Sequence, residues 1–288
     1  MGKEVIVSAL ILSVLLVISG VDECPQGGSF GGIGGKTEAP KCGVDFAVQT
    51  GLDKLSEGKT IALGSTFIVD VLLENFDSEP KSGEICIRDE ITDSSGGILS
   101  ECRAFNMPAA TYIGDTLESP ATLDITFPDT GYYKYENIPI DIDSKAHISI
   151  SYTQQTAYSS AIKVPLPESE IISFTQKPSP VTVTAEKTIT SIEDSAKLNL
   201  KFTISKQGNY NISSRDFKRE AIGFSSNFGG YNLDCPEVQQ GFIDFKSTKF
   251  ISCSALLPRE QISHPLIIYL DYGVKLSKDF SFKIVKTA

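Results

Sequence analysis

The sequence contains no tryptophan, and it has only two histidines among 288 residues. Without tryptophan, the chain cannot build the tryptophan–disulfide core of antibody-type domains. The six cysteines form no Cys-x-x-Cys motif, and neither His147 nor His264 adjoins a cysteine in the sequence. Because structural zinc sites need such spacings, we expect disulfides in place of a metal site, and we expect no cofactor.

Basic residues are in the minority. The chain has 26 Lys and Arg against 36 Asp and Glu, which gives a net charge of −10, and its pI is near 4.8. A surface of this sign repels phosphodiester backbones. We therefore expect no nucleic-acid partner.

A single long apolar run stands at the N-terminus, in residues 5–21, which read VIVSALILSVLLVISGV. About 17 residues is the lower limit for a helix that crosses a bilayer, and signal peptides have a similar apolar segment. We expect an N-terminal hydrophobic helix over residues 1–21 that acts as a signal peptide or as a membrane anchor. A lipoprotein signal is a third option, but Cys24 does not directly follow the small residues.

Residues 27–37 read GGSFGGIGGKT and end like a phosphate-binding P-loop. That motif needs glycine five residues before Gly35, where this chain has Phe30. It also needs a core strand upstream and a helix downstream, and the flanking sequence offers neither. We interpret residues 22–42 as a Gly-rich spacer that binds no nucleotide.

The cysteines fall into three short-range pairs with separations of 18, 16 and 18 residues. Six cysteines allow 15 connectivities, and the spacing favours sequential closure. The expected disulfides are Cys24–Cys42, Cys86–Cys102 and Cys235–Cys253. The middle one requires a hairpin that turns back through Gly96 and Gly97. Disulfides indicate an oxidising, extracytoplasmic compartment.

Beyond Cys42 the sequence alternates apolar and polar residues between turn signals, and no segment outside the leader shows a helical stripe. Strands are expected in segments such as STFIVDVLLEN, ATLDITFP, AHISISY, AKLNLKFTIS, LIIYLDYGVKL and DFSFKIVK. Many short strands without helices predict antiparallel β-sandwiches. We expect an all-β chain of two sandwich domains in tandem, over residues 43–165 and 173–288, with a proline-rich boundary.

These segments carry a resemblance to a family. The leader, the Gly/Cys spacer, EGKTIALGSTFIVDVLLENFDSEPKSGEICIRDE and the C-terminal LIIYLDYGVKLSKDFSFKIVK are similar to archaeal cell-surface proteins with adhesion-type, CARDB-like immunoglobulin-fold repeats. The resemblance covers most of the chain. It implies two immunoglobulin-like domains that face outward from a membrane and bind an undefined partner.

Aromatic residues near glycine turns are the candidate ligand-binding groups. One cluster contains Tyr132, Tyr133 and Tyr135 after Gly131, and a second contains Phe224, Phe228 and Tyr231 around Gly229 and Gly230. Exposed rings of this kind stack on sugars or form hot spots for proteins. The alternative is that these rings fill or edge the sandwich cores.

The sequence offers no convincing catalytic residues, so we expect a non-enzymatic protein. His147 is expected to face solvent on a strand, and His264 to lie in a loop before Pro265. Asp141 and Asp143 share one strand face, which indicates a solvated edge more than a calcium or glycosidase site. Asn211 begins an Asn-Ile-Ser tripeptide and is a candidate N-glycosylation site.

The expected function is cell-surface adhesion or assembly by a membrane-tethered, extracytoplasmic protein. The partner would be the membrane, through the N-terminal helix, and an unidentified envelope protein or glycan. Two alternatives stay open: a carbohydrate- or solute-binding module, and an accessory subunit of a membrane protein complex.

Overall fold

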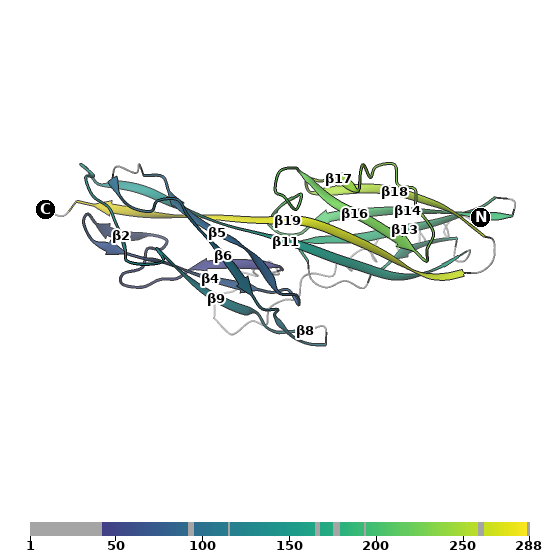
Figure 1. The fold of residues 1–288 in the computed structure, drawn as a ribbon, viewed down its shortest axis with the longest axis horizontal. Helices are drawn as coiled ribbons and strands as arrows, with labels where there is room; N and C mark the ends of the chain where they lie inside the picture. The colour runs from purple at the N-terminus through teal and green to yellow at the C-terminus, as the bar shows by residue number, and fades with distance from the viewer. Residues whose placement is uncertain are drawn as a thin grey trace, which may run out of the picture.

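The computed structural model describes residues 42–91, 95–114, 116–164, 168–174, 179–192, 194–258 and 262–286. Over these ranges the chain is all-β, with several antiparallel sheets and no helix (Figure 1). The N-terminal helix expected over residues 1–21 and the spacer that follows it lie outside the described residues. Within the described ranges, no helix has the length and apolar character needed to cross a membrane.

The chain forms nineteen described strands, many of them short. Their bounds are β1 Val44–Val48, β2 Lys59–Ala62, β3 Thr66–Phe67, β4 Val69–Asn75, β5 Lys81–Asp89, β6 Glu101–Met107, β7 Thr111–Ile113, β8 Thr116–Ser119, β9 Ala121–Phe127, β10 Tyr133–Lys134, β11 Ile142–Val164, β12 Ser169–Ile172, β13 Val181–Ile192, β14 Ser195–Lys206, β15 Asn211–Ser213, β16 Ala221–Phe228, β17 Phe242–Asp244, β18 Thr248–Pro258 and β19 Ile262–Val285. Two of these strands, β11 and β19, are far longer than the rest.

β11 and β19 form one continuous antiparallel ribbon. They pair residue by residue from Ile142 with Ile284 to Val164 with Ile262, a run of 23 residues on β11. At about 3.3 Å per residue, this ribbon is about 75 Å long. Figure 1 shows it running through both halves of the elongated molecule.

The ribbon keeps one face buried along most of its length. On β11 the buried side chains are even-numbered, from Ala146 through Tyr152 and Tyr158 to Val164. β19 follows the same rule from Leu266 to Ile284, except that Lys278 is exposed and Gly273 is buried. Successive side chains on a strand point to opposite faces, so an unbroken alternation keeps one set of side chains on one face. Both halves of the core therefore pack against the same face of the ribbon.

Two further sheets cover that face, one in each half. Sheet β1-β4-β9 faces the half of the ribbon that pairs with β5, and we call this the first unit. Sheet β12-β13-β14-β18 faces the half that pairs with β16, and we call this the second unit. In the first unit, Tyr135 stacks on Phe67 of β3 at 5.2 Å and on Phe282 of β19 at 5.9 Å. In the second unit, Phe202 of β14 meets Phe224 of β16 at 5.8 Å and joins the two layers.

The alternation expected from the sequence agrees with the burial of these strands. The inward residues named by the pattern are buried in β4, β14 and β19, for example Val71, Phe202 and Phe282. The pattern locates which face of a strand is buried because the side-chain period is two.

The strand pairing crosses the division that we expected near residues 165–173. Residues 274–284 of β19 pair with residues 142–152 of β11 inside the first unit, and β2 adds in parallel to residues 282–285. The C-terminal strand therefore belongs to both units. The alternation of apolar residues shows which face of a strand is buried, but not which strand lies beside it. The sequence pattern therefore could not predict that β19 pairs within both units.

A buried hydrogen-bonded network occupies the middle of the ribbon, where the two units meet, and we call this region the waist. Gln154 donates to Asp77 Oδ2 at 2.7 Å, and Lys81 Nζ lies 2.9 Å from the same oxygen. On the side of the second unit, the hydroxyls of Ser179 and Tyr272 lie 2.7 Å apart. Buried polar groups are costly unless paired, so these bonds hold the two units in one relative position.

The segment that leads into β1 also joins the waist. The backbone N–H of Val44 donates to the hydroxyl of Tyr152 at 3.0 Å, and the hydroxyl of Tyr210 donates to the carbonyl of Cys42. Tyr152 lies on the ribbon and Tyr210 lies in the second unit, just before β15. The start of the described chain is therefore bound to both units.

The hairpin between β5 and β6 turns back through Gly96 and Gly97, as the cysteine spacing requires. Both glycines have positive φ, at 69° and 92°. A Cβ on Gly97 would lie 2.0 Å from the ring of Tyr135, which is fully buried. Glycine at this position allows both the turn and the close approach of the ring.

We predict that Gly97→Ala destabilises the protein by about 2–4 kcal/mol, because the change combines an unfavourable φ with overpacking against Tyr135. Gly114→Ala is the matched control: its φ is +61° and nothing lies within 4 Å of a Cβ there, so about 1 kcal/mol is expected. Urea unfolding of the oxidised proteins measures both changes. Equal losses in the two variants would contradict the packing described for Gly97.

Candidate functional site

Two of the described disulfides are the sequential pairs expected from the spacing. Cys86 and Cys102 lie directly opposite each other on β5 and β6, with their Cα atoms 4.0 Å apart. Cys235 and Cys253 form the second bond. Cys42 is also disulfide-bonded, and its expected partner Cys24 lies outside the described residues.

The sulfur pair on β5 and β6 is not a metal site in this oxidised form. Glu84 lies close enough to Cys86 and Cys102 for the three side chains to surround an ion. However, zinc binds the thiolate, and both sulfurs here are consumed by the disulfide.

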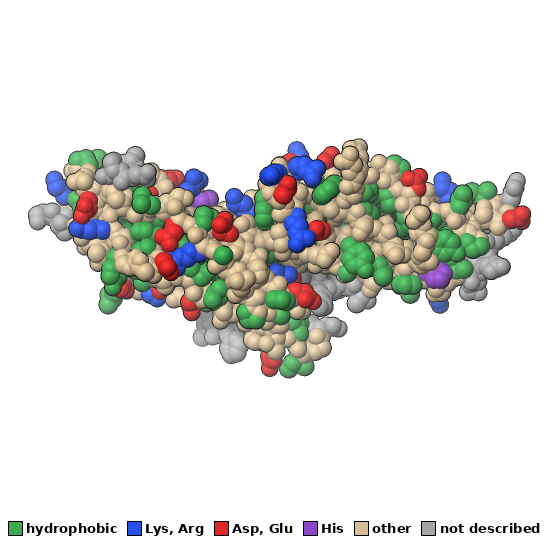
Figure 2. All heavy atoms as spheres, viewed as in Figure 1, with side chains coloured by type: hydrophobic (Ala, Val, Ile, Leu, Met, Phe, Trp, Pro, Cys, Tyr) green, Lys and Arg blue, Asp and Glu red, His purple; other side chains and the backbone are tan. Residues whose placement is uncertain are grey.

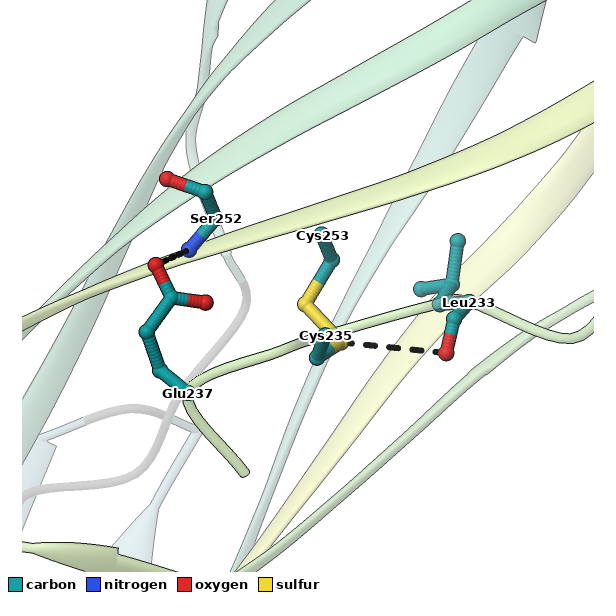
Figure 3. The surroundings of a disulfide bond; sticks show 5 residues. All are labelled: Leu233, Cys235, Glu237, Ser252 and Cys253. Carbon is teal, nitrogen blue, oxygen red and sulfur yellow. Dashed lines mark hydrogen bonds between the residues drawn. A yellow bond between two sulfur atoms is a disulfide. The ribbon is translucent and has the colours of Figure 1, made fainter. Parts of the chain in front are cut away.

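The disulfide of the second unit holds residues 234–237 against the edge of a sheet, and we call this segment the cover (Figure 3). Asp234 and Ser254 exchange two backbone hydrogen bonds of 2.8 Å beside the bond, and the carboxylate of Glu237 accepts from Ser252 N at 3.3 Å. Ser252 and Ser254 belong to β18, which is an edge strand of its sheet. Unpaired edges invite pairing with other chains, so this cover protects the middle of β18.

The tyrosine cluster expected to bind ligands lies mostly in the core, and ligand binding by it stays a prediction. Tyr132 is 63% exposed, but Tyr133 and Tyr135 are buried. The hydroxyl of Tyr133 donates to Glu101 at 2.7 Å, and that of Tyr135 donates to Asp89. The alternation of Tyr132 and Lys134 outward with Tyr133 and Tyr135 inward is the strand period, and this signal in the sequence indicated burial.

The second aromatic cluster also packs inward. Phe224 and Phe228 are buried on β16, and Tyr231 packs against Phe228 with ring centroids 6.1 Å apart. His264 lies near the start of β19, not in a loop, and its ring contacts those of Phe228 and Tyr231. These rings close the end of the second unit.

The remaining candidate catalytic groups do not assemble into a catalytic site. His147 lies partly exposed on the outer face of β11 and pairs with Asp279 of β19. Asp141 accepts from the backbone N–H of Lys286 at 2.8 Å, and both Asp141 and Asp143 are exposed, as expected for a solvated edge. In the described part of the chain, neither histidine is hydrogen-bonded to a serine, threonine or cysteine.

One pentapeptide, residues 27–31, fits the Gly-x-Ser-x-Gly pattern of serine hydrolases and lies outside the described residues. A nucleophile elbow requires a core strand before it and a helix after it. Here a membrane-length apolar run precedes it, and a glycine-rich stretch up to Pro40 follows. The pentapeptide therefore lacks the sequence context of a hydrolase.

A groove at the outer side of the waist is the site that the sequence pattern did not identify. It encloses about 540 Å³, and we call it the waist groove. The first unit contributes Glu84 and Ser151, while Lys206, Phe217 and Lys275 come from segments that follow in the chain. Ligand sites of proteins commonly have volumes of this size and lie where two units meet.

Phe217 is held at this groove by a tight loop. Its backbone has a φ of +58°, which is unfavourable for a bulky residue, and its N–H donates to the carbonyl of Ser214 at 2.8 Å. The ring lies against Gly273 of β19, where a Cβ would be 2.6 Å away. Phe217 nevertheless stays 42% exposed, so the loop presents an aromatic ring to the groove.

The waist groove carries more positive charge than the acidic chain as a whole. Lys206 and Lys275 form no ion pair within the described residues. Lys246 Nζ lies 3.7 Å from Glu220 Oε2, and both of these side chains are largely exposed. Figure 2 shows basic side chains gathered near the middle of the molecule, with acidic ones between them. The groove is therefore favourable for an anion.

A second, larger hollow of about 1060 Å³ adjoins the groove at the edge of the second unit. The two share Glu220, Phe245 and Lys246 as lining residues. Its remaining wall is mostly polar or charged and includes Glu237, Gln239, Gln240 and Asp244. The guanidinium of Arg219 lies over the ring of Phe242 at 4.5 Å. Together the hollows form one polar surface that extends from the waist over the second unit.

The sequence does not predict the waist groove because its lining residues come from distant segments of the chain. One signal was present: a glycine, Gly273, lies inside the last expected strand, between the apolar Tyr272 and Val274. A glycine inside a strand often marks the close approach of another group, which here is Phe217. Asn211 is exposed on β15, opposite Lys275, at the rim of the groove, and its glycosylation stays a prediction.

The buried phenols predict a pH dependence. Burial, strengthened by the neighbouring carboxylates Glu101 and Asp89, raises the pKa of Tyr133 and Tyr135. Burial likewise raises the pKa of Tyr152, Tyr158 and Tyr272 at the waist. Because the folded state favours the protonated phenols, their contribution to stability is complete below about pH 10 and is lost as the pH rises further.

We predict that these tyrosines ionise only when the chain unfolds. Tyrosinate absorbance of the native protein should lag behind that of the urea-unfolded chain, whose phenols titrate at about pH 10. The lagging fraction should appear in one step with the loss of β-sheet circular dichroism. Native and unfolded titrations that coincide would contradict the burial of these hydroxyls.

Comparisons with known proteins give no family. No protein-family model matches the chain. No curated protein matches it in sequence either.

Proposed function

We propose that this chain is a non-enzymatic, extracytoplasmic protein that acts in adhesion or assembly at the cell surface. The observation that carries this proposal is the ribbon of β11 and β19, which is common to both units and about 75 Å long. A continuous strand pair resists bending between units better than a flexible linker does. Such a rod suits a protein that holds a binding surface away from its attachment point.

The disulfides support an oxidising compartment. Cys86–Cys102 crosses two paired strands, and Cys235–Cys253 fastens the cover of β18. Bonds of this kind persist outside the cytosol, where thiols are not kept reduced. On the loop-entropy model each disulfide stabilises the folded state by about 3 kcal/mol. This stabilisation is present only where the cysteines are oxidised, as they are outside the cytosol.

The finer features of the proposal rest on sequence. We propose that the two units are immunoglobulin-like sandwiches, in line with the resemblance to CARDB-like surface repeats. Unlike separate tandem domains, the two units share the C-terminal strand β19. We further propose that the apolar residues 5–21 direct export and attach the chain to a membrane, as signal peptide or anchor.

Of the alternative functions, a carbohydrate- or solute-binding module is favoured by one specific feature, the waist groove. It combines an exposed ring with polar side chains that can donate and accept hydrogen bonds. An accessory subunit of a membrane complex would use the same rod with an integral membrane protein as partner.

The test is to locate the protein in its own cells and to identify what it holds. Intact cells are treated with a protease and with a membrane-impermeant thiol reagent, and the solubilised envelope is then used for a pull-down. We expect cleavage of the protein on intact cells, no thiol labelling before reduction, and co-purification with an envelope protein or glycan. Deletion of residues 5–21 should retain the chain inside the cell.

Recovery of the wild-type protein from the cytosolic fraction, with the cysteines labelled before reduction, would overturn the proposal. A resident cytosolic protein serves as the control for cell integrity during the protease and labelling steps.

A further inference from the structure

We propose that the waist groove binds an acidic saccharide, with a pyranose ring stacked on Phe217 and its carboxylate or sulfate held by Lys206 and Lys275. This inference rests on the proposed surface location, because such polymers are found outside cells. It names the ligand class for a groove of about 540 Å³ between the two units.

The aromatic ring is the first argument. Phe217 has one side against Gly273 and is 42% exposed, so the ring is fixed in place yet open to a ligand. Its φ of +58° is an unfavourable conformation, which the hydrogen bonds of Ser214 with Arg219 maintain. Strain of this kind accumulates where a side chain must be presented, and the apolar face of a sugar packs on such a ring.

The lysines are the second argument. Within the described residues, Lys206 and Lys275 have no carboxylate partner, although acidic side chains outnumber basic ones in the chain. Lys206 ends β14 and Lys275 stands on the outer face of β19, so the two approach the groove from different sheets. Two cations beside a ring select a sugar that carries negative charge over a neutral one.

The remaining lining groups suit the hydroxyls of the sugar. Ser151 and Ser213 carry hydroxyls that donate and accept, Asn211 carries an amide, and Glu84 carries an acceptor. Saccharides need such mixed partners because each ring hydroxyl both donates and accepts. A purely basic groove would favour a compact anion such as phosphate.

The experiment is calorimetric titration of the disulfide-bonded protein, made in a host that adds no sugar to Asn211. The probes are an oligogalacturonate, a maltooligosaccharide of the same length, and inorganic phosphate. We expect saturable binding of the oligogalacturonate that weakens with added salt, and no detectable binding of the other two.

Variants then separate the two parts of the site. Phe217→Gly removes the ring while relieving the positive φ, and should weaken binding by about five- to tenfold with an unchanged enthalpy of unfolding. Lys206→Ala and Lys275→Ala should each weaken it by about two- to fivefold and reduce the salt dependence. The controls are Phe250→Ala and Lys197→Ala, an exposed ring and an exposed lysine that do not line the groove.

Three results would overturn the proposal: no saturable binding of the oligogalacturonate, equal binding of the neutral oligomer or of phosphate, or the same loss in the control variants as in the groove variants. Lys275→Ala keeps the test decisive if Phe217→Gly fails to fold, because Lys275 is exposed. Absence of binding by a protein that is found on the cell surface would remove this inference alone. Cytosolic location would remove the proposed function itself.

Discussion

The ribbon of β11 and β19 is the constraint on which the rest of the structure depends. Its 23 residue pairs bury one face at nearly every position, with Lys278 as an exposed exception, so the sheets of both units must cover the same side. Because β19 follows the other described strands of the second unit in the chain, the first unit includes a strand from beyond the second. The two halves of the core are therefore continuous through a shared strand pair.

Hydrogen bonds at the waist fix the two units relative to each other on the shared ribbon. Among the mostly hydrophobic side chains on the inner face of β11, Gln154 and Thr156 stand at the middle. Gln154 bonds to Asp77 of the first unit, and Thr156 lies 3.3 Å from Ser179 of the second. Bonds of this kind have directions that apolar contacts lack, so they specify one arrangement of the units. This arrangement places Phe217 and the two lysines of the waist groove beside one another.

The sequence predicted the all-β class and the buried faces because alternation is a local property. Phe67, Val71 and Ile148 are buried as their positions indicated. It did not predict that residues 274–284 return to the first unit, because pairing between distant strands leaves no local pattern. The tyrosine cluster shows two local signals in conflict: the turn at Gly131 favours exposed rings, whereas the alternation of residues 132–135 places Tyr133 inside, where it is buried. The waist groove is lined by residues of strands that pair over long distances in the chain, so local sequence patterns do not predict it.

The most direct test of this account is scanning calorimetry of the disulfide-bonded protein with Phe202→Ala, a buried ring of the second unit. The shared ribbon predicts one two-state transition in which the variant loses about 3–5 kcal/mol, with hydrogen exchange at Val71 of the first unit accelerated as much as at Leu200 of the second. Two separable transitions, with protection of Val71 unchanged by the variant, would contradict it and restore two independent domains in tandem.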